Sequence, residues 1–203
     1  MHSMPLHTLA WEKYLAQHGI EVEDVEGSMH GKRNPELVRS WFGDDLPDPM
    51  VLEHGAAKER LFREMLVAEG LDRYRVPGVT EFLERHLDIP KAIGSNAEIA
   101  NIDFILDQYG LRKHFQAIIN GFEVERPKPF PDIYLRAAKL LGVEPADCIV
   151  FEDSPPGVQA ALSAGMRVVG VETTPTQLDG LDLKIRNFLE PDLETWLASQ
   201  MVG

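Results

Sequence analysis

The chain has 203 residues, of which 44% are hydrophobic and 26% are charged, and this ordinary globular composition excludes a mainly disordered protein. Its 20 basic and 33 acidic residues give a formal net charge of -13, which disfavours nucleic acids and anionic membrane surfaces as partners. No apolar stretch approaches the roughly 18 residues of a membrane span, and the first residues lack the pattern of a signal peptide. We therefore expect a cytoplasmic protein. An anionic small substrate remains compatible with the charge if local cations or a metal ion accompany it.

Helical patterns fill residues 4–76. Three segments have apolar residues at helical spacing, and each ends at a glycine: residues 5–19, 35–43 and 51–70. No strand pattern occurs among them. This part of the chain is expected to form an all-helical domain.

From residue 77 to residue 203, strand and helix patterns alternate. The predicted strands are residues 91–95, 116–120, 148–152 and 167–171, and the predicted helices lie within residues 76–86, 98–110, 131–142 and 156–165. Such alternation implies right-handed crossovers and a parallel sheet covered on both faces. The fold class is therefore α/β. The single cysteine, Cys148, falls in a strand pattern, so it excludes an internal disulfide and suits a buried position.

Polar side chains follow the first three predicted strands. Ser95 and Asn96 come after the first strand, Lys128 lies in the loop after the second, and Glu152 and Asp153 end the third. Ligands of parallel α/β sheets bind beyond the carboxyl ends of the strands. We therefore expect these side chains to meet at one edge of the sheet.

A hydroxyl, an ammonium group and two carboxylates together suit a phosphoryl group bound with Mg²⁺. Mg²⁺ prefers oxygen ligands and usually holds a substrate phosphate as well, and Ser95 before a helix suits an anion. Each residue also has a simpler interpretation. Glu152 and Asp153 could cap the following helix, Ser95 could be a plain N-cap, and Lys128 could be a solvated lysine in a rigid proline-rich loop.

The segments GSNAEIANIDFILDQYGL, RPKPFPDIYLRAAKLLGV and CIVFEDSPPGVQAALSAGMRVVGV resemble the haloacid dehalogenase-like hydrolases. Within that family the sequence is similar to the β-phosphoglucomutase-like phosphatases and phosphomutases with a helical cap, over almost its whole length. The resemblance implies a Rossmann-like core over residues 77–203 and a helical cap domain over residues 4–76. It also implies a Mg²⁺-dependent phosphatase or phosphomutase that acts on small sugar-phosphate-type metabolites.

The same resemblance assigns roles to individual residues. It makes Ser95 the phosphate-binding hydroxyl, Lys128 the catalytic lysine, and Glu152 and Asp153 the ligands of Mg²⁺. The residues expected to contact the substrate are His7, Lys32, Arg33 and Asn96. The simpler interpretations are a half-buried helix residue for His7 and a solvated basic pair for Lys32 and Arg33.

The family's first motif is missing from the sequence. That motif, Asp-x-Asp-Gly at the end of the central strand, supplies the nucleophile and the general acid/base, and His2 stands where relatives have an Asp. Without the nucleophile no aspartyl-phosphate forms, and without the strand the sheet has unpaired edges. We therefore expect this 203-residue chain to be inactive. A start assigned too far downstream, a truncated fragment and a non-catalytic relative are all consistent with this pattern.

Two other functions are compatible with some of these features. A pseudoenzyme would bind a phosphorylated metabolite through the same residues without turnover. A phospho-acceptor domain of the receiver type also places acids, a hydroxyl and a lysine at strand ends, but it has no large helical lobe to close over a substrate. The sequence does not separate phosphatase from phosphomutase, and it indicates no obligate protein partner.

Overall fold

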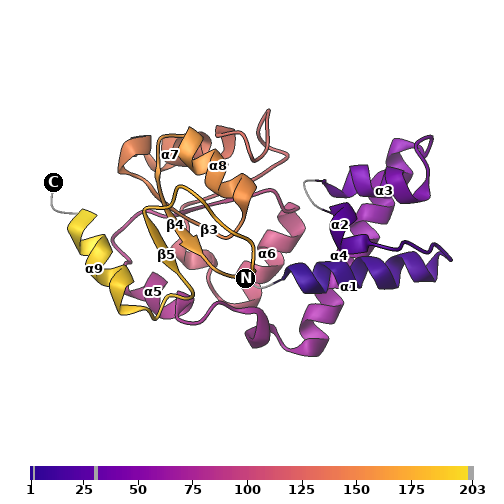
Figure 1. Ribbon diagram of the computed structural model, residues 1–203, viewed down its shortest axis with the longest axis horizontal. Helices are drawn as coiled ribbons and strands as arrows, with labels where there is room; N and C mark the ends of the chain where they lie inside the picture. The colour runs from indigo at the N-terminus through magenta and orange to yellow at the C-terminus, as the bar shows by residue number, and fades with distance from the viewer. Residues whose placement is uncertain (2, 30–31, 201–203) are drawn as a thin grey trace. The chain divides into compact units, whose positions relative to one another are not determined.

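The computed structural model describes residues 1, 3–29 and 32–200, so His2 lies outside the described residues. The chain forms two compact units, Met1–Tyr74 and Arg75–Gly203. Figure 1 traces both along the chain. Within the described residues, the structure contains no helix that is both long enough and apolar enough to cross a membrane.

The first unit is helical, as its sequence pattern predicts. Its helices are α1 (Met4–Gln17), α2 (Val25–Met29), α3 (Asn34–Phe42) and α4 (Asp48–Glu69), followed by a 3₁₀ turn at Leu71–Tyr74. Both α1 and α3 pack against α4. The fully buried side chains of this unit include Trp11, Leu15, Val38 and Phe62. The five-residue helix α2 is not predicted, because one turn is too short to show a helical period.

The second unit alternates strands and helices. Its elements are α5 (Val79–Arg85), β1 (Ala92–Ser95), α6 (Ile99–Gln108), β2 (Ala117–Asn120), α7 (Asp132–Leu141), β3 (Ile149–Glu152), α8 (Pro155–Ser163), β4 (Arg167–Val171), β5 (Leu183–Ile185) and α9 (Pro191–Gln200), with 3₁₀ turns at Arg112–His114 and Pro145–Asp147. Every strand pair is parallel. The α/β prediction is therefore confirmed, and β5 and α9 are additions to the predicted elements.

Helices cover both faces of β3, β4 and β5 (Figure 1). On one face, α7 and α8 pack onto a core that includes Ile119 of β2, Val150 of β3 and Val168 of β4. On the other face, α5 and α9 pack onto a core that includes Val169 and Ile185. Since Val168 and Val169 are neighbours in β4, they show the alternation expected of a strand that is buried on both sides.

The described strands form two sheets rather than one. One sheet has the order β1-β2 and the other β3-β4-β5, so β1 and β3 each have one edge without a strand partner among the described residues. Both sheets lie under the same helical layer, because the core beneath α7 and α8 includes residues of β2, β3 and β4. All four residues of β1 are only half-buried, as are Ile149 and Phe151 of β3. This arrangement fits the expectation that the sheet lacks its central strand.

Candidate active site

Hydrogen bonds join the end of β1 to the loop that carries Lys128. The side chain of Asn96 accepts a hydrogen bond from the backbone N–H of Lys128 at 3.2 Å and donates one to the Lys128 carbonyl at 3.3 Å. The Lys128–Pro129 peptide bond is cis. Asn96 therefore fixes the backbone of Lys128 next to Ser95, as expected from their positions after two neighbouring parallel strands.

The ammonium group of Lys128 reaches the end of β3. It pairs with Oε1 of Glu152, and the side chains of the two residues are only 9% and 7% exposed. The simpler interpretation of Lys128 as a solvated lysine therefore does not apply. Tyr134, which the sequence analysis did not single out, also contacts both groups. Its hydroxyl donates a hydrogen bond to Oε1 of Glu152 at 2.6 Å, and its ring centre lies 4.7 Å from the Lys128 ammonium.

Both oxygens of the Glu152 carboxylate accept hydrogen bonds. Beyond the two bonds at Oε1, its Oε2 accepts hydrogen bonds from the backbone N–H of Asp153 at 2.9 Å and from the N–H and hydroxyl of Ser154 at 3.1 and 3.0 Å. Burial by itself would raise the pKa of Glu152, but the charge of Lys128 and these hydrogen bonds outweigh burial and lower the pKa. Glu152 therefore stays ionised and organises its neighbours, and its role as a direct metal ligand stays a prediction.

Gly157 makes room for Glu152 at the start of α8. A Cβ atom added there would lie 2.0 Å from the carboxylate carbon of Glu152, so any larger residue would force the carboxylate out of its present position. The N-cap of α8 is Ser154, whose hydroxyl accepts a hydrogen bond from the Gly157 N–H at 3.2 Å. The simpler interpretation of Glu152 and Asp153 as helix caps is therefore wrong for this helix, since Ser154 has that role.

Asp153, the second predicted ligand of Mg²⁺, differs from Glu152 in its surroundings. It is half-buried, and its Oδ2 accepts a hydrogen bond from the hydroxyl of Thr173 at 2.7 Å, which orients the group. Across the described part of the chain, no group of three or more His, Cys, Asp or Glu residues is arranged to hold a metal. Mg²⁺ commonly binds through one or two carboxylates, waters and a substrate phosphate, so this donor set is compatible with that ion.

Ser95 lies at the end of β1 with its hydroxyl close to the following backbone. Its Oγ accepts a hydrogen bond from the N–H of Ala97 at 3.1 Å, whereas the N-cap position of α6 belongs to Glu98. Ser95 is thus not the N-cap of α6. Its hydroxyl keeps its own proton for donation, as phosphate binding requires.

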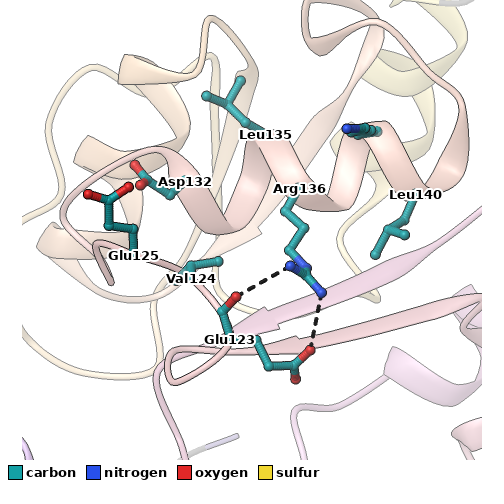
Figure 2. Close-up of a pocket in the computed structure, with 8 residues that line it drawn as sticks. Glu123, Val124, Glu125, Asp132, Leu135, Arg136 and Leu140 are labelled. Atoms are coloured by element: carbon teal, nitrogen blue, oxygen red, sulfur yellow. Dashed lines mark hydrogen bonds and ion pairs between the residues drawn. The ribbon is translucent and has the colours of Figure 1, made fainter.

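The pocket in Figure 2 lies beside the Lys128 loop but contains none of the predicted site residues. It is lined by residues of the loop after β2 and of α7: Glu123, Val124, Glu125, Asp132, Leu135, Arg136, Lys139 and Leu140. Arg136 donates a hydrogen bond to the carbonyl of Glu123 at 3.3 Å and pairs with the Glu123 carboxylate at 3.6 Å. On the same loop, Arg126 forms a two-point pair with Asp132. These pairs anchor the loop to α7, which is the structural role we assign to the walls of this pocket.

The three residues predicted to contact substrate in the helical unit differ in their surroundings. His7 is half-buried and stacks on Phe62 with ring centres 3.8 Å apart. Lys32 and Arg33 are both exposed, and Arg33 pairs with Glu36 at 3.4 Å. The structure therefore gives His7 a defined position, whereas for Lys32 and Arg33 the simpler interpretation as a solvated pair remains open.

A buried charged cluster surrounds His7. The ammonium of Lys58 lies 3.3 Å from Nδ1 of His7, and it pairs with Glu59, which in turn accepts a hydrogen bond from Asn34 at 2.8 Å. The side chains of Lys58 and Glu59 are only 2% and 6% exposed. This cluster is not among the features predicted from the sequence. The signal was present, because Lys58 lies on the same helical stripe as the buried Val51 and Phe62.

This cluster should make the stability of the helical unit depend on pH. Burial, reinforced by the charge of Lys58, lowers the pKa of His7 from 6.5 to about 4, so neutral His7 contributes stability that is lost as the pH falls from 6.5 to 4. Burial alone would raise the pKa of Glu59, but the charges of Lys58 and His7 outweigh burial and lower this pKa to about 2. The contribution of ionised Glu59 to stability is therefore lost as the pH falls below 4.5. Between neutral pH and about pH 4, we expect the free energy of unfolding to fall by up to about 3 kcal/mol through His7.

Urea denaturation followed by tryptophan fluorescence at a series of pH values measures this effect. The His7→Phe variant keeps a ring against Phe62 but cannot titrate, so the loss between pH 6.5 and 4 should largely disappear in it. An unchanged pH dependence in the variant would contradict the assignment to His7.

Comparisons with known proteins all indicate the same family. The family model described as haloacid dehalogenase-like hydrolase matches residues 2–165. The chain is 40% identical over 192 residues to a bifunctional riboflavin kinase/FMN phosphatase of Arabidopsis thaliana, and the match covers 91% of the chain and 49% of that protein. The chain therefore spans about half the length of this relative. It is also 31% identical over 193 residues to a beta-phosphoglucomutase of Bacillus subtilis, covering 93% of the chain and 85% of that enzyme.

A solved structure supports the same fold. The crystal structure of an HAD hydrolase, family IA, variant 3, from Entamoeba histolytica matches the chain with a TM-score of 0.82 and 28% sequence identity. The match covers 98% of this chain and 93% of the other. The structural similarity therefore extends across both units of the chain.

Proposed function

Because the chain belongs to the haloacid dehalogenase-like hydrolase family, whose matched relatives include a phosphatase and a phosphomutase, we propose that its site binds the phosphate of a small sugar-phosphate-type metabolite together with Mg²⁺. The observation that carries this proposal is the contact chain from Asn96 through Lys128 and Glu152 to Asp153. It joins the ends of strands from both sheets at one place. That is where ligands of parallel sheets bind.

Each residue has a part in holding the phosphate. The hydroxyl of Ser95 and the ammonium of Lys128 supply donors for its oxygens, and Asn96 keeps the Lys128 backbone in place. Asp153, oriented by Thr173, would hold Mg²⁺, which neutralises phosphate charge when bound. Glu152 as a second ligand would have to release some of the hydrogen bonds it now accepts. Together these groups offset the repulsion between a phosphate and a protein with a net charge of -13.

Turnover requires a nucleophile that this arrangement does not supply. Phosphoryl transfer in the family proceeds through a carboxylate that attacks phosphorus, but Glu152 is saturated with hydrogen bonds and Asp153 is the candidate metal ligand. We therefore expect the 203-residue chain to bind without turning over.

The helical unit would select the rest of the substrate. His7, held between Phe62 and Lys58, and the exposed cations Lys32 and Arg33 are the groups we assign to this task. Lys58 and Glu59 fix the position of His7. A cytoplasmic location remains the expectation for such a metabolic activity.

A pseudoenzyme that binds a phosphorylated metabolite is the second candidate. It is favoured by the same saturation of Glu152, because the groups gathered at the site serve binding and none of them is a free carboxylate for attack on phosphorus. The two candidates differ only in whether an added nucleophile produces turnover.

Mg²⁺-dependent binding of inorganic phosphate tests the site directly. Isothermal titration of the purified chain should show phosphate binding that requires Mg²⁺, and Asp153→Asn should weaken it by at least about tenfold. Asp147→Asn, which makes the same charge change in the exposed turn before β3, is the matched control and should have no effect. Equal affinity in the parent chain and in Asp153→Asn would overturn the assignment. Turnover of p-nitrophenyl phosphate by the parent chain would overturn the expected inactivity.

A further inference from the structure

Tyr134 touches three parts of the candidate site at once. Its hydroxyl binds Glu152 at the end of β3, and its ring lies beside the Lys128 ammonium. Its ring also packs against the end of β1, where a Cβ added to Gly94 would lie 3.3 Å from Tyr134 Cε1. No other residue in the described chain is shown to contact all three.

We propose that Tyr134 is a positioning residue of the site, which fixes the Lys128 ammonium and the Glu152 carboxylate in the places where they serve phosphate binding. The placement of these two groups follows from the contacts alone. What they do for a phosphate rests on the proposed function.

The chemistry of Tyr134 matches this role. The residue is 7% exposed and lies in the core beneath α7 and α8. Burial, together with the charge of Glu152, raises its pKa well above the usual value, so the phenol keeps its proton and donates it to Oε1. The face of an aromatic ring attracts an ammonium group, most strongly where water is excluded.

The ring and the carboxylate divide the donors of Lys128 between them. An ammonium group has three N–H donors. One of them is used by Glu152, and one can face the Tyr134 ring. One donor then remains for a phosphate oxygen. Without the tyrosine hydroxyl, Glu152 would lose the hydrogen bond that orients Oε1 toward Lys128, and the ammonium group would be held less firmly.

A purely structural role makes a different prediction. If Tyr134 served only to fill the core, phenylalanine would replace it without consequence for Lys128, because the ring and its packing are retained. The hydroxyl distinguishes the two roles. Tyr134→Phe is therefore the main variant, and Tyr134→Leu, which also removes the ring face, is the second.

The reactivity of Lys128 provides a readout that needs no catalysis. The folded chain is treated with an acetylating reagent, and acetylation of each lysine is followed by mass spectrometry. The internal reference is Lys139, an exposed lysine on α7, the helix that carries Tyr134. We expect Lys128 to react at least about tenfold more slowly than Lys139 in the parent chain, about threefold faster in Tyr134→Phe than in the parent, and faster still in Tyr134→Leu.

A matched tyrosine controls for the loss of a buried hydroxyl. Tyr74 is 9% exposed and its hydroxyl binds Glu69. Tyr74→Phe should leave Lys128 reactivity unchanged. If Lys128 in the parent reacts as fast as Lys139, or if Tyr134→Phe changes nothing, the positioning role is overturned.

Phosphate titration separates this inference from the proposed function. With Mg²⁺ present, Tyr134→Phe should weaken phosphate binding by about threefold to tenfold, and the effect should shrink in a Glu152→Gln background, because the hydroxyl acts through that carboxylate. Protection of Lys128 that depends on Tyr134, in a chain that binds no phosphate, would support the positioning role and overturn the proposed function. Phosphate binding that is unchanged by Tyr134→Phe would support the proposed function and overturn the positioning role.

Discussion

Replacing Lys128 with methionine is expected to lower the free energy of unfolding of the α/β unit by about 3 kcal/mol at neutral pH. Methionine keeps much of the side-chain volume but removes the ammonium group. Glu152 then remains as a buried, charged carboxylate whose remaining donors, among them Tyr134 and Ser154, are neutral. A buried charge that loses its ionic partner is strongly destabilising, because the desolvation of the carboxylate is no longer offset.

The contribution of Glu152 to the pH dependence of the α/β unit should reverse in this variant. In the parent, the lowered pKa of Glu152 means that its stabilising contribution is present above the unfolded-state pKa of 4.5 and is lost as the pH falls below it. In Lys128→Met, burial acts without the opposing charge and raises the pKa of Glu152. The folded state then takes up a proton more readily than the unfolded state, so stability should recover as the pH is lowered from neutral.

Two comparisons complete this experiment, which is read by urea denaturation. Lys139→Met, at an exposed position of α7, should change stability by no more than about 0.5 kcal/mol. Glu152→Gln added to Lys128→Met should restore part of the loss, since it removes the unpaired charge. Equal losses in Lys128→Met and Lys139→Met would contradict the structural account of this pair.

The gathering of the site residues could be predicted from the sequence because it depends on topology. Ser95, Lys128 and Asp153 each follow a strand, and parallel strands bring their carboxyl ends to one edge of the fold. That inference needs only the order of the strand and helix patterns. Contacts join Asn96 to Lys128 and Lys128 to Glu152, while the roles assigned to these residues stay predictions.

What the sequence could not reveal is how each polar group divides its hydrogen bonds. Tyr134 fits the apolar stripe of its helix, so nothing in the pattern showed that its hydroxyl reaches Glu152. Equally, two adjacent acids in the sequence look equivalent, but Glu152 points into a ring of donors and Asp153 does not. Such differences depend on side-chain directions in three dimensions.

The short elements that were not predicted lack strong local patterns. The strand β5 has only three residues, one of them the exposed Lys184, so it offers too short an alternation to recognise. The short helix α2 has the same difficulty. Both are stabilised by packing on larger elements that the sequence does specify, as β5 is by its pairing with β4.

A strand supplied between β1 and β3 is expected to change this protein more than any substitution. Among the described residues, β1 and β3 each have one edge without a strand partner, and apolar residues of β3 such as Ile149 and Phe151 are only half-buried. A short apolar segment joined ahead of Met1 could pair with both edges, cover these side chains and, if it ends in Asp-x-Asp-Gly, place a carboxylate beside Ser95 and Asp153. We expect the extended chain to melt roughly 5 °C or more above the parent.

The same extension should separate the enzyme from the pseudoenzyme. With Mg²⁺, the extended chain should hydrolyse p-nitrophenyl phosphate roughly 1,000-fold or more above the parent, the scale on which a nucleophile contributes to catalysis. An extension that ends in Asn-x-Asn-Gly is the matched control: it should raise the melting temperature equally and leave turnover at the parent level. A gain in stability without any turnover from the Asp-x-Asp-Gly form would favour the pseudoenzyme, because the fold would then be complete and the chemistry still absent. Strand pairing and burial of apolar residues do not depend on whether the added residues carry a charge. Failure of either extension to raise the melting temperature would therefore contradict the expectation that one added strand pairs with both β1 and β3.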